Sequence, residues 1–273
     1  MRLDNVLWLC AALLAGCMGG GDPLSEDEHV AGWANTASAL GVFAVGYEPI
    51  GFADGQDQFD DPACPVTTDD GTTVTVRGGC TDNTGVKWVG LATLVRDGTA
   101  RHVTFDGYGN DAFLGMVRTS GRFDVTDAGG DVHQFDVDVH RSGGIETTIR
   151  YTGSVAGSYQ GRTVWNGAGR ITRDGITINS GTIDAATVDE VRDDAVCAGQ
   201  GASGSTTLTS EAHEVVITYD GATACDPDNA AQWARDGEDR GTIKGITCAA
   251  GGGAGSGMIV IALALVLRRR RSA

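Results

Sequence analysis

The chain has 273 residues, 42 of them glycine, and carries a formal net charge of −16. A hydrophobic content of 41% excludes wholesale disorder, and glycine without a Gly-X-Y period excludes collagen. Lys87 and Lys244 are the only lysines, so we expect no basic surface and no nucleic-acid partner. The length allows one large hydrophobic core or two small ones.

The first 17 residues indicate export. Arg2 precedes an apolar run from Val6 to Leu14, which is typical of a secretory signal and too short to span a bilayer permanently. The run ends in Leu14-Ala15-Gly16-Cys17, which resembles the bacterial lipobox. The resemblance implies that Cys17 is lipidated and begins the mature chain. The alternative is an ordinary secretory signal (residues 1–17) with an incidental cysteine, and in either case residues 18–24 read as a flexible tether.

Residues 25–248 predict a β-rich exported domain that begins with a helix. Ser25 and Glu28 have the spacing of a capping box, so a helix is expected at about 26–40. No proline lies between residues 66 and 226, which favours strands there. Asp-Gly dipeptides recur in this stretch as hairpin signals. Alternating or β-branched runs predict strands at 73–76, 88–95, 102–105, 133–139, 145–151, 164–172, 176–178 and 215–219.

The fold class that follows is mostly β. We expect an antiparallel meander, as a sandwich or an open barrel-like sheet, with an N-terminal helix and a C-terminal membrane or sorting helix. Asp226-Pro227 favours one further short helix, running through Trp233 and ending at Gly237.

An internal repeat spans about residues 72–106 and 146–184. Trp88-x-Gly90-x-x-x-Leu94-x-Arg96-Asp97-Gly98 matches Trp165-x-Gly167-x-x-x-Ile171-x-Arg173-Asp174-Gly175 at every stated position. The even spacing places tryptophan, glycine, the aliphatic residue and arginine on one face of a strand. We interpret the repeat as two β-meander copies in which each tryptophan packs where glycine leaves room. The alternative is a ligand-binding motif.

The cysteines predict two disulfides. Of seven, Cys10 leaves with the signal, Cys17 carries lipid, and Cys248 is assigned to the C-terminal tail. The remaining four are Cys64, Cys80, Cys197 and Cys225. An even remainder in an exported chain indicates disulfides, and the local pairs Cys64–Cys80 and Cys197–Cys225 close the shortest loops. A four-cysteine zinc site is the alternative, but it lacks Cys-x-x-Cys spacing.

Motifs for catalysis and cofactors are weak. Gly199-x-Gly201-x-x-Gly204 has the spacing of a dinucleotide fingerprint, but no βαβ unit is predicted around it. His213-Glu214 begins like the helix of a zinc protease, without the second histidine. We therefore expect no cofactor. A candidate metal site consists of Asp136, Asp138 and His140, which share one strand face; its alternative is the hydrated face of a half-buried strand.

The C-terminal 26 residues predict a membrane or sorting segment. Cys248 is followed by small residues at 249–257, the uncharged run Met258 to Leu267 and four arginines, Arg268 to Arg271. The uncharged stretch from 249 is just long enough to cross a bilayer, and the arginines would remain cytoplasmic. This combination resembles the MYXO-CTERM class of sorting tails over residues 248–273. The resemblance implies a removable handle with Cys248 at the processing site, whereas the alternative is a permanent anchor.

These features favour a non-catalytic lipoprotein of the outer membrane or cell surface with a structural, adhesive or ligand-binding role. Its expected partners are membrane lipid, through Cys17 and the tail, and the export and sorting machinery. Without the signal and the tail the chain keeps 15 basic against 35 acidic residues, a net charge of about −20. The alternative function is an exported hydrolase that uses scattered carboxylates such as Asp136 or Asp106.

Overall fold

The computed structural model describes residues 21–53, 61–112, 115–143, 145–157, 161–175, 180–198, 200–226 and 230–244. The signal and the sorting tail, with Cys10, Cys17 and Cys248, lie outside the described residues, as does the predicted strand at 176–178. Among the residues that are described, no helix combines the length and apolarity needed to cross a membrane.

The N-terminal region forms two helices, α2 (Asp27–Ala37) and α3 (Ala39–Ala53), where the sequence predicted one at about 26–40. The expected capping box is wrong, because Glu26 is the N-cap and makes no side-chain capping hydrogen bond. Ser38 separates the helices, and its hydroxyl accepts a hydrogen bond from the Gly41 amide at 3.1 Å. No pattern in the sequence predicts α3, because this helix is apolar almost all round and contains Pro49. Such a helix has no polar stripe to reveal its period.

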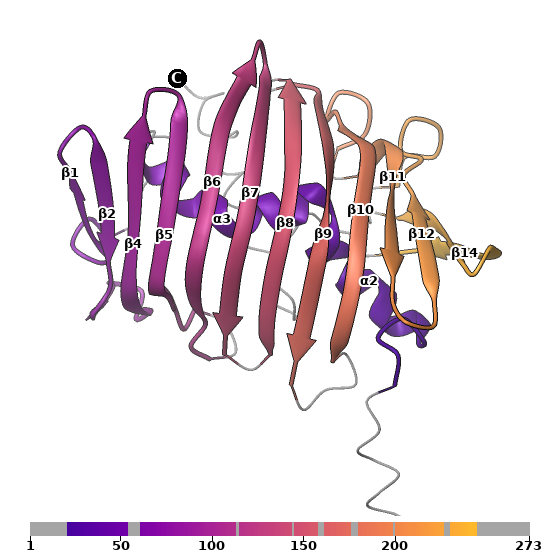
Figure 1. The fold of residues 1–273 in the computed structure, drawn as a ribbon, viewed down its shortest axis with the longest axis horizontal. Coiled ribbons are helices and arrows are strands. Elements are labelled where there is room, and N and C mark those ends of the chain that lie inside the picture. Colours follow the sequence, from indigo (N-terminus) through magenta and orange to yellow (C-terminus); the bar gives the residue numbers. More distant parts are fainter. Residues whose placement is uncertain are drawn as a thin grey trace, which may run out of the picture.

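In the described part of the chain, fourteen strands form one antiparallel sheet in chain order, except that the short β3 pairs only with β4 (Figure 1). The strands are β1 (Val66–Asp69), β2 (Thr73–Arg77), β3 (Cys80–Thr81), β4 (Lys87–Asp97), β5 (Ala100–Asn110), β6 (Arg118–Gly129), β7 (Val132–Ser142), β8 (Glu146–Gly157), β9 (Thr163–Asp174), β10 (Gly181–Arg192), β11 (Gly201–Thr209), β12 (Glu214–Thr218), β13 (Ala231–Arg235) and β14 (Glu238–Ile243). The predicted antiparallel meander is thus confirmed, as an open sheet.

One predicted element has the wrong type. The sequence favoured a short helix from Asp226-Pro227 through Trp233, but Ala231–Arg235 is the strand β13. Ala231, Trp233 and Arg235 alternate as buried positions, and β13 pairs with β12 on one side and β14 on the other. Pairing on both sides outweighs a helix-start signal, because it satisfies the backbone of the whole segment.

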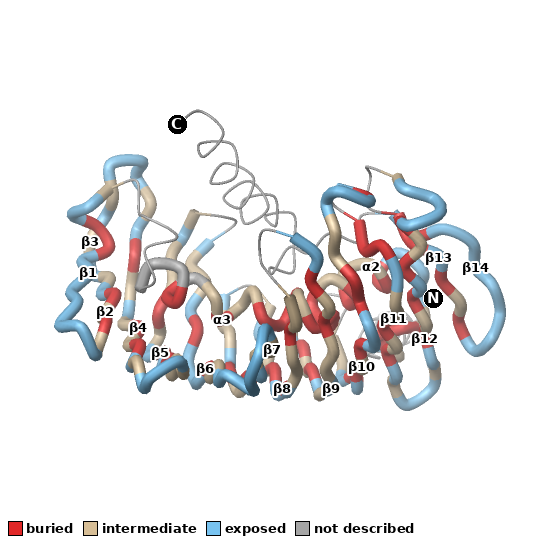
Figure 2. The backbone as a smooth tube through the Cα atoms, turned by 90° about the horizontal axis from the view of Figure 1, so that it is seen from above, coloured by how far each residue is buried: buried red, intermediate tan, exposed pale blue. Residues whose placement is uncertain are grey.

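The sheet curves around the two helices, so that its inner face holds the core (Figure 2). Phe43 of α3 is the centre of an aromatic cluster, with ring centroids 5.4 Å from Phe123, 5.4 Å from Phe135 and 5.2 Å from Trp165. Gly46 makes this approach possible, since a Cβ there would lie 2.1 Å from the Phe123 ring. The inner face of the sheet is therefore occupied by the chain's own helices.

The two copies of the sequence repeat fall on β4 and β9, and a turn at Gly98 and Thr99 follows the first copy. Both tryptophans, Trp88 and Trp165, are buried. The equivalent arginines have different partners. Arg96 makes a two-bond ion pair with Asp69 of the edge strand β1, at 2.8 and 3.0 Å, whereas Arg173 lies over the Trp33 ring of α2 at 4.2 Å.

Both predicted disulfides are present. Cys64–Cys80 joins the segment before β1 to β3, with Cα atoms 5.9 Å apart, and Cys197–Cys225 joins the β10–β11 connection to the segment after β12, with Cα atoms 5.5 Å apart. These local pairs exclude a four-cysteine zinc site.

Candidate functional site on the outer face of the sheet

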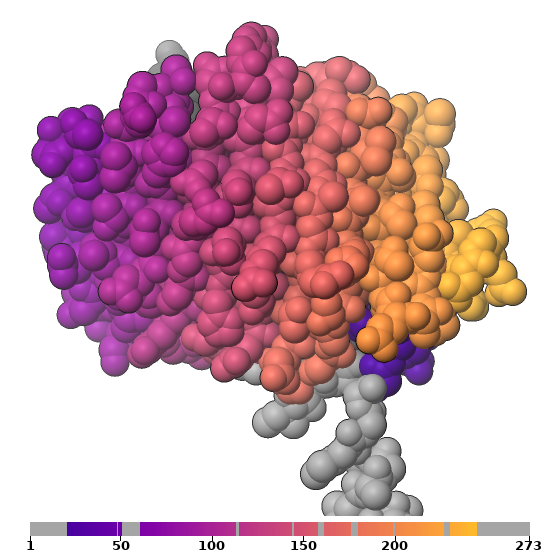
Figure 3. Space-filling model, viewed as in Figure 1, coloured from indigo at the N-terminus to yellow at the C-terminus, as the bar shows by residue number. Residues whose placement is uncertain are grey.

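The outer face of the sheet is its exposed face, because α2 and α3 fill the inner one. Figure 3 shows this face as a broad surface built by the strands, on which the indigo N-terminal segment emerges only at the lower margin. Long central strands with regular pairing hold its side chains in fixed register.

One row of side chains crosses ten strands of this face in direct Cα register, and we call it the outer row. Its members on β1, β2, β4 and β5 are threonines, the next five are charged, and the last is again a threonine. In order they are Thr68, Thr75, Thr93, Thr104, Arg122, Asp138, Arg150, Arg170, Asp184 and Thr209. Register places these residues together although up to 141 positions separate them in the chain.

The charges of the outer row alternate in sign except at one place. Arg122 faces Asp138, Asp138 faces Arg150, and Arg170 faces Asp184, but Arg150 and Arg170 face each other. Arg150 contacts Asp138 through Nε alone, at 3.4 Å. Arg150 and Arg170 are therefore the one place in the row where two positions of like charge are direct register partners.

The two ends of the charged segment are well paired. Arg170 donates from Nε and Nη2 to the two carboxylate oxygens of Asp184, both at 2.8 Å. This hydrogen bonding raises the pKa of Arg170 and lowers the pKa of Asp184. At the other end Arg122 lies between Asp124, at 2.8 Å, and Asp136, at 3.4 Å. Both charges of the Arg170–Asp184 pair therefore persist at neutral pH.

A groove runs beside the arginine pair. Two shallow hollows, of about 310 and 560 Å³, open here, and because Arg150 and Ala168 line both they form one groove over β6–β11. The depth comes from the neighbouring register row, whose side chains are short: Thr152, Ala168, Ala186 and Thr207. The groove offers a floor of methyl groups and hydroxyls beneath two guanidinium groups.

The sequence-predicted metal residues lie at the edge of this groove. Asp136, Asp138 and His140 all lie on the outer face of β7, as their alternation predicts, but each has a different partner. Asp136 contacts Arg122, Asp138 contacts Arg150, and the His140 ring is 3.2 Å from the Thr148 hydroxyl. Among the described residues, no group of three His, Cys, Asp or Glu side chains is placed to hold a metal ion. Asp106, named with Asp136 for a hydrolase, lies on β5 outside the groove lining.

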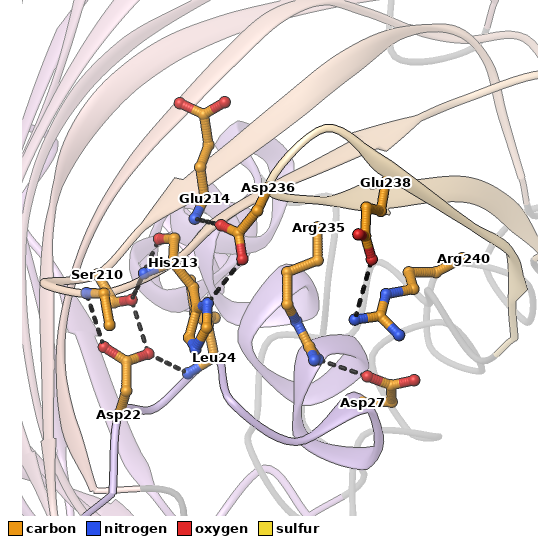
Figure 4. A network of polar contacts seen from close by, with 11 residues as sticks. Asp22, Leu24, Asp27, Ser210, His213, Glu214, Arg235, Asp236, Glu238 and Arg240 are labelled. Carbon is orange, nitrogen blue, oxygen red and sulfur yellow. Dashed lines mark hydrogen bonds and ion pairs between the residues drawn. The ribbon is translucent and has the colours of Figure 1, made fainter.

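A second polar cluster lies at the lower rim of the sheet, where it fastens the N-terminal segment (Figure 4). Asp22 accepts hydrogen bonds from the Ser210 hydroxyl at 2.7 Å and the Ala212 amide at 3.1 Å. Asp236 accepts from the Glu214 amide at 2.9 Å and contacts His213 at 2.8 Å. The cluster satisfies turn amides and joins the segment before α2 and the turn after β13 to the segment between β11 and β12, so its role is structural.

The weak motifs of the sequence fall on strands. Gly201 and Gly204 are part of β11, which is antiparallel to both neighbours, while Gly199 lies outside the described residues. His213 and Glu214 lead into the strand β12. Neither segment forms the helix that its motif requires.

The juxtaposition of Arg150 and Arg170 is not predicted by the sequence. Alternation within the predicted strands 145–151 and 164–172 does turn Arg150 and Arg170 outward, opposite to Ile149 and Ile171. Their juxtaposition depends on the register between β8 and β9, which no local pattern encodes. The partner Asp184 was missed because β10 was not predicted. No known protein family, curated protein or solved structure matches this chain.

Proposed function

We propose that this chain is an exported, lipid-anchored protein of the cell envelope that acts without catalysis, as a binding protein. The observation that carries the binding role is the groove on the outer face, which lies on rigid paired strands while the inner face is filled by α2 and α3. A preformed polar groove needs no reordering of the chain to accept a ligand.

Export is supported by the two disulfides, which persist in oxidising compartments. Anchoring rests on the lipobox sequence at Leu14 to Cys17. In cells fed with labelled palmitate, the protein should incorporate label, and Cys17→Ser should abolish incorporation. Labelling that survives Cys17→Ser would contradict lipidation at this residue.

The C-terminal tail is proposed to act as a removable sorting handle. The mature surface form should then end at or near Cys248 and lack the four arginines. Intact-mass spectrometry of protein recovered from whole cells tests this. Recovery of full-length chains alone, ending in Arg-Ser-Ala, would instead establish a permanent second anchor.

The binding role is tested by filling the groove. Ala168→Tyr places a large side chain on its floor, and Thr104→Tyr adds the same side chain to the same face outside it. Both positions are exposed, so both variants should fold normally. The variants are compared in a background that carries Cys17→Ser and lacks residues 249–273, so that neither proposed anchor holds the protein on a membrane. Retention of this purified protein on isolated envelopes of the producing cells should fall at least tenfold for Ala168→Tyr and stay within twofold for Thr104→Tyr. Equal retention of the two variants would contradict binding through the groove.

A further inference from the structure

We infer that Arg150 and Arg170 bind the carboxylate of a small, otherwise weakly charged ligand whose body lies in the groove. The inference rests on the proposed binding function and names the chemistry that the groove recognises. Its basis is the one break in the alternating charges of the outer row, where Arg150 and Arg170 occupy directly opposite positions on the adjacent strands β8 and β9.

The arginine pair retains free hydrogen-bond donors. Arg150 uses only Nε toward Asp138, and Arg170 uses Nε and Nη2 toward Asp184. Within the described part of the chain, both Nη atoms of Arg150 and Nη1 of Arg170 therefore have no protein partner. Their side chains are 74% and 65% exposed, so a ligand reaches them without moving the protein.

A carboxylate fits these donors. Side chains directly opposite each other on neighbouring antiparallel strands have Cβ atoms about 5 Å apart, so one anionic group can contact both guanidinium planes. Guanidinium groups bind carboxylates with paired, charge-assisted hydrogen bonds, which are stronger than neutral ones.

The surroundings limit the ligand to one anionic group. Asp138 and Asp184 flank the arginine pair on either side, and the whole chain carries a net charge of −16. A polyanion would be repelled by both, whereas a single carboxylate on a neutral or zwitterionic body is not. That body would lie over Ala168 and Ala186, with the hydroxyls of Thr152 and Thr207 at its two ends.

The test is a titration followed by NMR of the arginine Nε–Hε signals of the full-length protein in a neutral detergent. N-acetylglycinate and glucuronate carry the carboxylate on a peptide-like and a sugar-like body. N-acetylglycinamide is the uncharged counterpart, and methyl phosphate supplies a different oxyanion. We expect saturable shifts at Arg150 and Arg170 with at least one carboxylate, and the tighter of the two identifies the body. N-acetylglycinamide should bind at least tenfold more weakly than N-acetylglycinate.

Substitutions test whether carboxylate binding depends on Arg150 and Arg170 or on positive surface charge in general. Arg150→Gln and Arg170→Gln should each weaken carboxylate binding at least tenfold. Arg77→Gln is the matched control, since Arg77 is an exposed arginine of β2 that lines neither hollow, and it should change affinity less than twofold. Equal weakening by all three variants would overturn the inference, as would binding of methyl phosphate alone or non-saturable shifts.

The experiments distinguish a wrong carboxylate inference from a wrong proposed function. If no carboxylate binds while Ala168→Tyr still abolishes envelope retention, the groove binds a ligand of other chemistry and this inference is wrong. If carboxylates bind as expected while Ala168→Tyr leaves retention intact, the anion site stands and the proposed envelope-binding role is wrong.

Discussion

At the scale of single residues, Arg173 is a buried cation held by a helix. Its side chain is only 5% exposed, stacks on Trp33, donates to the Gly32 carbonyl at 2.9 Å and contacts the Thr36 hydroxyl. Burial, together with the nearby Arg141, lowers the pKa of Arg173 to about 10. It still carries its charge at neutral pH, so its contacts to α2 offset a desolvation cost.

Arg173→Met should therefore lower the free energy of unfolding by about 2–4 kcal/mol, because it removes the cation–π contact and leaves the Gly32 and Thr36 oxygens without this donor. Urea denaturation measures the loss. Arg96→Met is the matched control, since Arg96 is the equivalent residue of the repeat and pairs with an exposed aspartate of an edge strand. Equal losses in the two variants would show that the docking of α2 does not depend on Arg173.

At the scale of elements, α3 is stable because of its packing, and Gly46 shows this most directly. A helix normally gains up to about 1 kcal/mol when an interior glycine becomes alanine. At position 46 the added methyl would meet the Phe123 ring at 2.1 Å, so the aromatic cluster around Phe43 must shift.

Gly46→Ala should accordingly destabilise the protein by about 1–3 kcal/mol. Gly32→Ala in α2 is the control, since its methyl would lie 3.9 Å from Arg173, at ordinary contact distance, and it should be neutral or stabilising. Thermal denaturation of both variants decides the point. A stabilised Gly46→Ala variant would contradict the packing described here.

Each disulfide restrains a local loop, of 16 residues for Cys64–Cys80 and 28 residues for Cys197–Cys225. Replacing either pair by alanine should cost about 3 kcal/mol, with the longer loop losing about 0.5 kcal/mol more on the loop-entropy model. Denaturation curves of the two double variants provide the comparison. Native, unreduced protein should show no reactive thiol from these four cysteines, and labelling of any of them with iodoacetamide would contradict the pairing.

For the molecule as a whole, the pH dependence of stability should come from aspartates whose carboxylates accept hydrogen bonds in turns or form ion pairs. Hydrogen bonds from Thr84 and Trp88 lower the pKa of Asp82 to about 2, and the Arg96 hydrogen bond lowers that of Asp69 to about 2. Hydrogen bonds to Glu214 and His213 lower the pKa of Asp236. Because the folded pKa lies below the unfolded value of 3.8, each group stabilises the fold above pH 4.

That contribution should be lost as pH falls from about 4 toward 2, when the folded carboxylates take up protons. The urea midpoint should stay nearly level between pH 7 and 5 and then fall steeply. Asp82→Asn should reduce the slope between pH 4 and 2, since its amide does not titrate. A profile that is flat below pH 4 would show that these aspartates have the same pKa in the folded and unfolded states.

Much of this architecture was predictable from local patterns. Alternation along Trp88–Val95 and Val164–Thr172 predicts β4 and β9 with the correct inward faces, because side chains of a strand alternate by geometry alone. The pairing of four cysteines follows from loop length and the oxidising compartment that the signal implies. In contrast, α3 was not predicted, because a helix that is apolar all round has no amphipathic period. The strand β13 was predicted as a helix, because the helix-start signal Asp226-Pro227 carries no information about pairing with neighbouring strands.

Only part of the candidate site can be predicted from the sequence. Local patterns in the sequence predict several of the strands, the two disulfide pairs and the outward direction of Arg150 and Arg170, but they do not predict β6 or β10, and the Asp106-Gly107 hairpin signal lies inside β5. Only the tertiary structure decided that these two arginines face each other, that Asp138 and Asp184 flank them, and that Ala168 and Ala186 leave a groove beside them. The physical reason is register: a shift of one residue between β8 and β9 would turn one arginine to the core, and register is fixed by the packing of the inner face on α3.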